Sequence, residues 1–348
     1  MIKKAICTTA FLALSISPAL AWGTAGHRMI NQAAMQTLPD TMPAFLRSPD
    51  AIHEITMLGP EADRLKGSGY PHDGDEDPGH YLDALDDLSI AHVLRLNALP
   101  DTRAAYDTAL RAAHTDQYRQ GFLPYSIIDG WEAVRKDFAY WRAEDFLAQH
   151  AATPEDRAWF ATDRTLRETL TLRDIGVWGH YVADGSQPLH VTVHFNGWGK
   201  FPNPKNYSNS GEVHSSFESG YVTRNAKLDG VQAIVAADPV ASFIAGGATS
   251  KVQTAAAIAQ IEAYLAGSAQ AVGPLYVLEA KNSWSGPAAA ANTDFVQHQL
   301  ARGAREYRDL IVAAYESSLT QTVAYPEIPL QDILSGKTVP TAHNFGSD

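Results

Sequence analysis

The chain has 348 residues, of which 45% are hydrophobic and 19% are charged, and its formal net charge is -12. This composition supplies enough apolar side chains for a large core and excludes an intrinsically disordered chain. The acidic balance argues against a broad basic face that binds nucleic acid through many phosphates. A single cysteine, Cys7, excludes a disulfide framework within the chain.

The first 21 residues have the pattern of a signal peptide. Two lysines precede a largely apolar run over residues 5–16, and Ala19-Leu20-Ala21 has the A-x-A form of a cleavage site. The apolar run is shorter than the roughly 20 residues that span a bilayer. We therefore expect cleavage after Ala21 and a periplasmic or secreted protein. The mature chain would begin at Trp22, without cysteine and with a net charge of 25 − 39 = -14.

The remaining chain shows the apolar spacing of helices along most of its length. Helices are predicted over residues 29–38 and 125–146. Thr153 has the features of an N-cap for the next helix, which begins at Pro154 and runs to about Asp184. Further helical patterns cover residues 230–245, 252–271 and 293–319. Since no period-two strand pattern is sustained, the predicted fold class is all-α.

Two loops interrupt the helical patterns. Residues 71–87 are rich in Asp, and residues 196–211 are rich in Gly, Asn and Pro. No linker of Pro and Ser divides the chain, so we expect one mostly helical domain over residues 22–324. Residues 325–348 would form a C-terminal tail that wraps the surface.

The spacing of histidine and acidic residues in this sequence indicates a metal site. In the predicted helix, His180 and Asp184 lie one turn apart on one face, so that an imidazole and a carboxylate can converge on one ion. The Gln-Pro turn that follows allows His190 to point into the same cavity. His214 and Glu218 form a second i, i+4 pair. These five nitrogen and oxygen ligands suit zinc or another borderline divalent metal, although a solvated helix face would explain either pair alone.

The predicted mature N-terminus offers a further ligand. Trp22-Gly-Thr-Ala-Gly-His27 places a free α-amine five residues before a histidine. An α-amine has a pKa of about 8, so a metal ion can displace its proton near neutral pH. The alternative interpretation is a flexible terminus.

In combination, these motifs resemble the zinc-dependent single-strand nucleases of the S-one/P-one type, whose superfamily includes the zinc-dependent bacterial phospholipase C. The motifs are Trp-Gly-x-x-Gly-His after a signal peptide, His-x-x-x-Asp-x-x-Gln-Pro-Leu-His at residues 180–190, and His-x-x-x-acid at residues 214–218. The resemblance spans residues 22–218. It implies a helical fold with three zinc ions and nine ligands, which match Trp22, His27, Asp63, His80, His180, Asp184, His190, His214 and Glu218.

The resemblance also implies how these ligands are shared. One zinc ion would be held by Asp63, His80 and His180. A second would be held by Trp22 and His27, with Asp184 bridging the two ions. The third would be held by His190, His214 and Glu218.

A mechanism follows from this resemblance. Hydroxide between the bridged ions would attack phosphorus, Asp63 and Asp184 would be the catalytic carboxylates, and the products would carry a 5′-phosphate. Tyr81, which follows a ligand directly, would stack on a base of single-stranded DNA or RNA, although simple core packing is the alternative for this ring. Three divalent ions would outweigh the three ligand carboxylates, so an acidic chain could still bind a short stretch of nucleic acid. No obligatory protein partner is indicated.

Several features leave alternatives open. Asp63 lies in Glu-Ala-Asp-Arg, which shares only Ala-Asp with the family's segment. The nucleases usually have Asp at the position of Glu218, where phospholipases have Glu. The loop with Trp198, Phe201 and Tyr207 could form a second stacking platform or an apolar mouth for lipid. The alternatives are a phospholipase C acting on phosphatidylcholine-like lipids and a zinc-binding protein without catalysis. The role of His194 is undecided.

Overall fold

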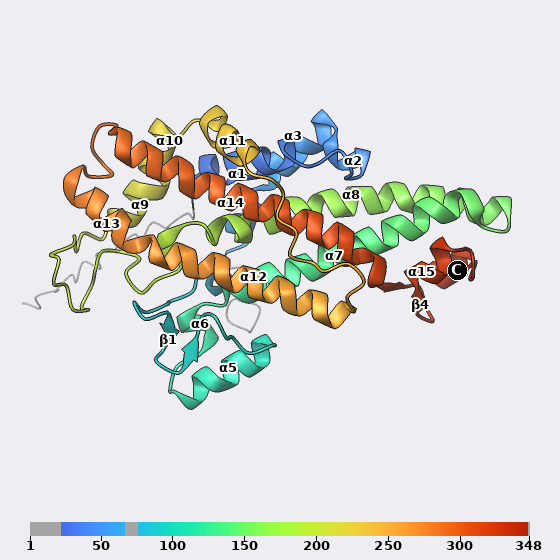
Figure 1. Cartoon of the computed structure of the whole chain (residues 1–348), viewed down its shortest axis with the longest axis horizontal. Helices are drawn as coiled ribbons and strands as arrows, with labels where there is room; N and C mark the ends of the chain where they lie inside the picture. Colours follow the sequence, from blue (N-terminus) through green and yellow to red (C-terminus); the bar gives the residue numbers. More distant parts are fainter. Residues whose placement is uncertain (1–21, 67–75, 347–348) are drawn as a thin grey trace, which may run out of the picture.

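The computed structural model describes residues 22–66 and 76–346, and the predicted signal peptide lies outside these residues. The protein is all-α, as predicted from the sequence (Figure 1). Two small antiparallel hairpins accompany the helices. β1 (Ser89–Ile90) pairs with β2 (Leu94–Arg95), and β3 (Thr322–Val323) pairs with β4 (Ile328–Pro329). None of the described helices is long and apolar enough to cross a bilayer.

Helices make up most of the described residues, and the connections between them vary in length. In chain order, the α-helices are α1 (Gly23–Gln36), α2 (Ala44–Arg47), α3 (Pro49–Leu58), α4 (Glu61–Arg64), α5 (Arg103–Ala112), α6 (Gln117–Gln120), α7 (Leu123–His150), α8 (Pro154–Asp184), α9 (Val213–Ser215), α10 (Val222–Asn225), α11 (Leu228–Ala237), α12 (Ser250–Gln270), α13 (Val272–Lys281), α14 (Ala290–Ser317) and α15 (Leu330–Leu334). The short 3₁₀ and π segments are η1 (Asp77–His80), η2 (Pro188–His190), η3 (Ser216–Tyr221), η4 (Ser318–Thr320) and η5 (Ala342–Phe345).

The long hairpin of α7 and α8 extends from the middle of the molecule to the end where α15 lies (Figure 1). α8 has the predicted boundaries: the Thr153 side chain accepts a hydrogen bond from the Asp156 amide at 3.0 Å, Pro154 occupies the first turn, and the helix ends at Asp184. α14 crosses α7 and α8, and α1 packs against α3, α8 and α14. The large core formed between these helices surrounds the C-terminal end of α8.

Other elements differ from the sequence prediction. α1 begins at Gly23, six residues before the predicted start, because its first turns are rich in glycine and show little apolar periodicity. α11 ends at Ala237, just before Pro239, instead of continuing to residue 245. α3 was not predicted, although the Ser48 side chain caps its start in front of a proline.

The C-terminal segment packs against the end of the α7–α8 hairpin that is distant from Asp184. Val323, Leu330 and Ile333 form a second core cluster with residues of α7 and with Phe160 of α8. β3 and β4 lie on either side of the predicted boundary at residue 325. This segment therefore fixes the outer end of the hairpin, and the domain boundary itself stays a prediction.

A buried carboxyl group lies between α7 and α8. Glu144 is fully buried, and its Oε1 is 3.8 Å from Nε of Arg167. Burial, together with the negative charge of Asp163, raises the pKa of Glu144 to about 8. The folded protein therefore favours the neutral acid.

This shift predicts a pH-dependent effect of Glu144→Gln. The pKa is raised on folding, so the stabilising contribution is complete below the unfolded value of about 4.5 and is lost as the pH rises through about 8. The neutral amide should raise the free energy of unfolding by up to about 5 kcal/mol at pH 9 and change it little at pH 5. Thermal denaturation at both pH values checks this, with the exposed Glu316→Gln as control. An equal effect at both pH values would contradict the prediction.

Candidate metal centre

The last turn of α8 presents an imidazole and a carboxylate in the arrangement that the sequence predicts. His180 and Asp184 are fully buried, and Nε2 of His180 lies 3.4 Å from Oδ2 of Asp184. Nδ1 of His180 lies 2.8 Å from the carbonyl oxygen of Gly59. Because a carbonyl only accepts, Nδ1 carries the proton and Nε2 presents a lone pair to the interior.

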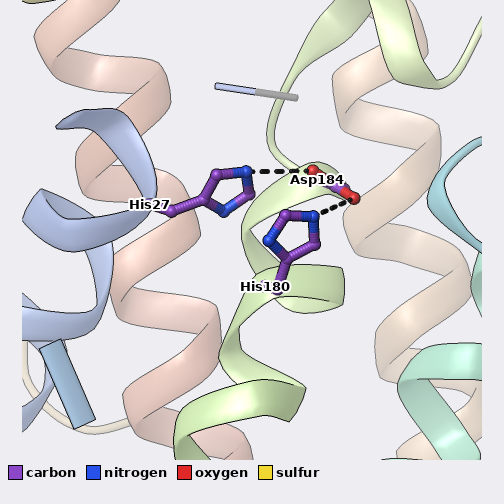
Figure 2. A group of neighbouring side chains, drawn as sticks. All are labelled: His27, His180 and Asp184. Atoms are coloured by element: carbon purple, nitrogen blue, oxygen red, sulfur yellow. Dashed lines mark ion pairs between the residues drawn. The ribbon is translucent and has the colours of Figure 1, made fainter. Parts of the chain in front are cut away.

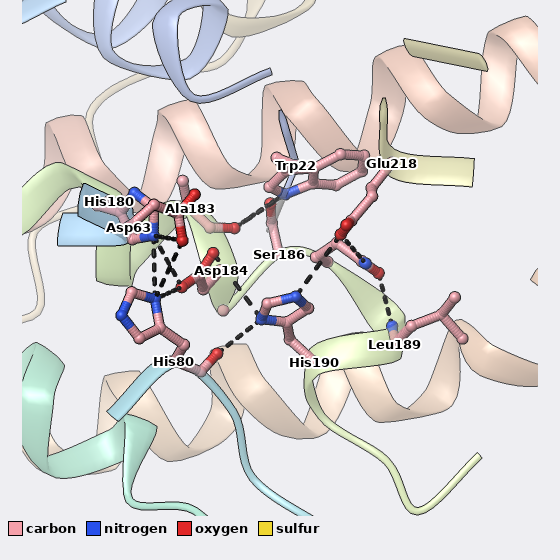
Figure 3. Close-up of polar contacts among 12 residues, drawn as sticks. Trp22, Asp63, His80, His180, Ala183, Asp184, Ser186, Leu189, His190 and Glu218 are labelled. Atoms are coloured by element: carbon pink, nitrogen blue, oxygen red, sulfur yellow. Dashed lines mark hydrogen bonds and ion pairs between the residues drawn. The ribbon is translucent and has the colours of Figure 1, made fainter. Parts of the chain in front are cut away.

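A first cluster forms around this lone pair (Figure 3). His80, at the end of η1, places Nδ1 3.0 Å from Nε2 of His180 and 3.0 Å from Oδ2 of Asp184. Asp63 of α4 places Oδ1 3.5 Å from Nε2 of His180. The structure thus brings Asp63 into the cluster although its sequence segment matches the nuclease pattern poorly.

A second group lies on the other side of Asp184. The ring of His27 from α1 stacks on that of His180, with centroids 3.8 Å apart and planes at 10° (Figure 2). Nε2 of His27 is 3.5 Å from Oδ1 of Asp184. Each carboxylate oxygen of Asp184 therefore faces a different group of imidazoles, which is the geometry of a bridging ligand.

Trp22 anchors the start of α1 beside this carboxylate. Its buried indole N–H donates to the carbonyl oxygen of Ala183 at 2.9 Å and to Oγ of Ser186 at 2.8 Å (Figure 3). Gly23 has a φ of +53°, and a Cβ there would lie 3.0 Å from Oγ of Ser219, which explains the glycine after the tryptophan. The structure places Trp22 next to Asp184. The binding of a metal ion by the α-amine of Trp22 stays a prediction.

The third cluster consists of His190, His214 and Glu218. Nδ1 of His190 donates to the carbonyl oxygen of His80 at 2.6 Å, so its Nε2 presents a lone pair 3.6 Å from Oε2 of Glu218. Nε2 of His214 is 2.9 Å from the same oxygen. Glu218 lies in the π-helical segment η3, a rare conformation that is frequent at functional sites.

Gln187 fixes the orientation of this cluster. Its Oε1 accepts a hydrogen bond from the Leu189 amide at 2.6 Å, so its Nε2 must face the cluster. There Nε2 donates to Nε2 of His214 and to Oε2 of Glu218, each at 3.0 Å. His214 therefore accepts at Nε2, with its lone pair directed inward. The sequence motif contains Gln187, but its spacing did not reveal this role.

Burial controls the charge of these groups. Burial raises the pKa of Asp184 well above its usual value, and the neighbouring carboxylate of Asp63 raises it further. Burial lowers the pKa of His80 and of His190, which favours neutral imidazoles. Burial also opposes ionisation of Asp63, but the positive charge of Lys66, whose Nζ lies 2.7 Å from Oδ1, favours the carboxylate and lowers its pKa.

The donor atoms fit metal ions. Three sets of side chains converge within ligand distance: His27, His180 and Asp184; Asp63, His80 and His180; and His190, His214 and Glu218. Several of their atoms are buried without a hydrogen bond, namely Oδ1 of Asp184, Nε2 of His190 and Oε1 of Glu218. Buried polar atoms normally have partners, and inward-facing lone pairs of both nitrogen and oxygen cannot satisfy one another. Cations would compensate all three sets.

A pocket of about 390 Å³ opens onto the clusters. Its lining includes the ligand candidates His80, His190 and His214 and two cationic side chains, Lys66 and Arg119. Nζ of Lys66 is 2.7 Å from Oδ1 of Asp63. The i, i+3 spacing of Lys66 from Asp63 on a helical segment could have indicated this contact, whereas Arg119 gave no signal in the sequence.

The pocket also has an aromatic and polar wall. Tyr81 and Phe195 line it together with Asp83 and Asn196. The hydroxyl group of Tyr81 donates to the carbonyl oxygen of Tyr118 at 3.0 Å, which fixes the ring. Burial raises the pKa of Asp83 to about 7, so this carboxyl group can donate as well as accept near neutral pH.

The aromatic residues of the loop over residues 196–211 are mostly enclosed. Trp198 and Tyr207 are each 7% exposed and line a neighbouring cavity of about 670 Å³. His194 stacks on Trp198 at 3.7 Å and places Nε2 3.0 Å from Oδ1 of Asp86. His194 therefore supports this loop and lies outside the three sets of candidate metal ligands. Among the aromatic residues of the loop, only Phe201, 39% exposed, keeps a substantial exposed surface.

No protein-family model matches the chain, and no curated protein matches it. The resemblance to the S-one/P-one nucleases therefore stays a prediction that depends on the motifs.

The position of Asp184 predicts the effect of Asp184→Asn on metal binding. Removing the shared charge should release the ions on both sides of this residue while the cluster of Glu218 keeps its own. Elemental analysis after dialysis against zinc measures the metal content, and the exposed Asp294→Asn on α14 is the control. An unchanged metal-to-protein ratio would contradict the bridging role.

Proposed function

We propose that the protein is a periplasmic or secreted zinc-dependent endonuclease that cleaves single-stranded DNA and RNA and leaves 5′-phosphates. The observation that supports this most is the carboxylate of Asp184, which two imidazole groups share beneath a pocket with cationic side chains. Neighbouring metal ions joined by a carboxylate are suited to phosphodiester hydrolysis.

Zinc suits the donor atoms best. Imidazoles dominate, carboxylates complete each set, and sulfur is absent from all three sets. When bound, zinc lowers the pKa of water towards about 7 and neutralises charge on phosphate oxygens. The residues that would hold it are Asp63, His80 and His180; Trp22, His27 and Asp184; and His190, His214 and Glu218.

The side chains of the protein would orient the reactants. Asp63 contacts Lys66, which lines the pocket, so its carboxylate would orient a water molecule and accept its proton. Lys66 and Arg119 offer positive charge to a phosphate group that enters the pocket. The cluster of Glu218 lies on the opposite side of Asp184 from Asp63, so it would support the departing 3′-oxygen (Figure 3).

The pocket wall supports recognition of single strands. A base can stack on an aromatic ring only when it is released from a duplex, and stacking tolerates every base type. Tyr81 supplies such a ring beside His80. Asp83 and Asn196 offer hydrogen bonds to a base edge. The pocket is small, so we expect a short substrate footprint.

A comparison of substrates tests the proposed function. The zinc-loaded protein should release acid-soluble nucleotides from denatured DNA and from RNA, act more slowly on duplex DNA, and lose activity in Asp184→Asn. The exposed Phe195 at the pocket, 41% accessible, and Glu218 favour phospholipase C as the second candidate. Hydrolysis of phosphatidylcholine vesicles without nuclease activity would replace the proposal with that candidate. Tight zinc binding without turnover of either substrate would indicate a non-catalytic protein.

The role of the Tyr81 ring can be tested with a matched pair of variants. Tyr81→Ala should lower kcat/KM on single-stranded DNA about 5- to 150-fold, because one stacked base contributes about 1–3 kcal/mol. Tyr81→Phe keeps the ring and should stay close to the wild type. Equal losses in both variants would show that the hydroxyl contact with Tyr118, and not stacking, matters.

A further inference from the structure

The last carbonyl groups of α8 are bound by side chains from α12. The hydroxyl group of Tyr264 donates to the carbonyl oxygen of Val182 at 2.6 Å. The hydroxyl group of Ser268 donates to the carbonyl oxygen of Gly185 at 2.5 Å. All these groups are buried, and the two carbonyls flank Asp184 in the chain. α12 therefore holds the backbone on both sides of the shared carboxylate.

Arg302 of α14 completes this arrangement. Its Nη1 donates to Oγ of Ser268 at 2.5 Å, and its Nη2 donates to the carbonyl oxygen of Tyr264. The guanidinium also lies 4.8 Å from the centre of the Tyr264 ring. A charged donor polarises the serine hydroxyl and strengthens the bond that it donates. Its positive charge also complements the negative end of the α8 dipole.

Two further observations set Arg302 apart from an ordinary surface arginine. Within residues 22–66 and 76–346, no carboxylate forms an ion pair with it, whereas Arg305 pairs with Asp238 and Arg308 with Asp309. A Cβ at Gly267 would lie 2.6 Å from Nη2 of Arg302, so the absence of a side chain there admits the guanidinium. Its hydrogen-bond acceptors, the Ser268 hydroxyl group and the Tyr264 carbonyl group, are neutral groups on the side of α12 that faces the end of α8.

The geometry points to Ser268 and Arg302 as positioning residues for the metal centre. Asp184 must direct one oxygen to His27 and the other to His80, and a small rotation of the backbone would misplace both. Ser268 and Arg302 prevent that rotation by holding the carbonyl group of the next residue, Gly185. They touch neither the pocket nor a ligand side chain, so they act only through the backbone.

This inference rests on the proposed function for the identity of the metal. It predicts that Ser268→Ala and Arg302→Met weaken binding of the two zinc ions that share Asp184 by about 10- to 100-fold, as expected for groups that orient ligands. The third zinc ion should be retained. In active protein kcat should fall while KM stays near the wild-type value, because the pocket wall is untouched.

Zinc titration against a competing chelator measures the affinities. The matched controls are Ser317→Ala, a buried serine that bonds within its own helix, and Arg305→Met, one turn along α14. Thermal denaturation of the zinc-free proteins separates positioning from folding, and there the variants should match their controls. Zinc affinities equal to those of the controls would overturn the inference, as would losses fully explained by lower stability of the zinc-free fold.

The two proposals fail in different ways. If the wild-type protein binds zinc but cleaves no nucleic acid, the proposed function is wrong. The comparison of zinc affinities would still decide the role of Ser268 and Arg302. A wild-type protein that binds no zinc would overturn both. Nuclease activity with unchanged zinc affinity in both variants would overturn the positioning role alone.

Discussion

The structure depends on one electrostatic constraint, the burial of carboxylates among neutral imidazoles. Asp184 is completely enclosed, and its two oxygens face different histidines. Taking a carboxylate out of water is costly unless a cation or several donors compensate it. His180 and His190 each donate the Nδ1 proton to a backbone carbonyl oxygen, so the Nε2 atom of each ring presents a lone pair to the buried site. Shared cations would resolve this conflict for all groups at once.

The fold meets this constraint by bringing distant segments to the end of one helix. α8 supplies His180 and Asp184, while α1, α4 and η1 supply His27, Asp63 and His80, and η2, α9 and η3 supply His190, His214 and Glu218. The core around α8 is continuous from Trp22 to α14, so the site is built inside one helical body. With cations in the three sets, positive charge would be local to this site, beside Lys66 and Arg119, and would reconcile an acidic chain with the proposed anionic substrate.

Much of this could be predicted from local sequence. The limits of α8 follow from its cap and its proline, and the His180–Asp184 pair follows from helical spacing. The roles of Gln187 and Ser268 could not be predicted, because each depends on a contact between segments distant in the chain or on a side-chain orientation that spacing does not encode. The π-helical turn that contains Glu218 could not be predicted either, because apolar spacing was compared only with that of regular α-helices.

The most direct test of the account is diffraction from crystals of the zinc-soaked protein on both sides of the zinc absorption edge. The account predicts three anomalous peaks, two of them on opposite sides of the Asp184 carboxylate and the third beside Glu218. A single peak, or peaks that leave Asp184 without a metal contact, would contradict the claim that this carboxylate organises the site.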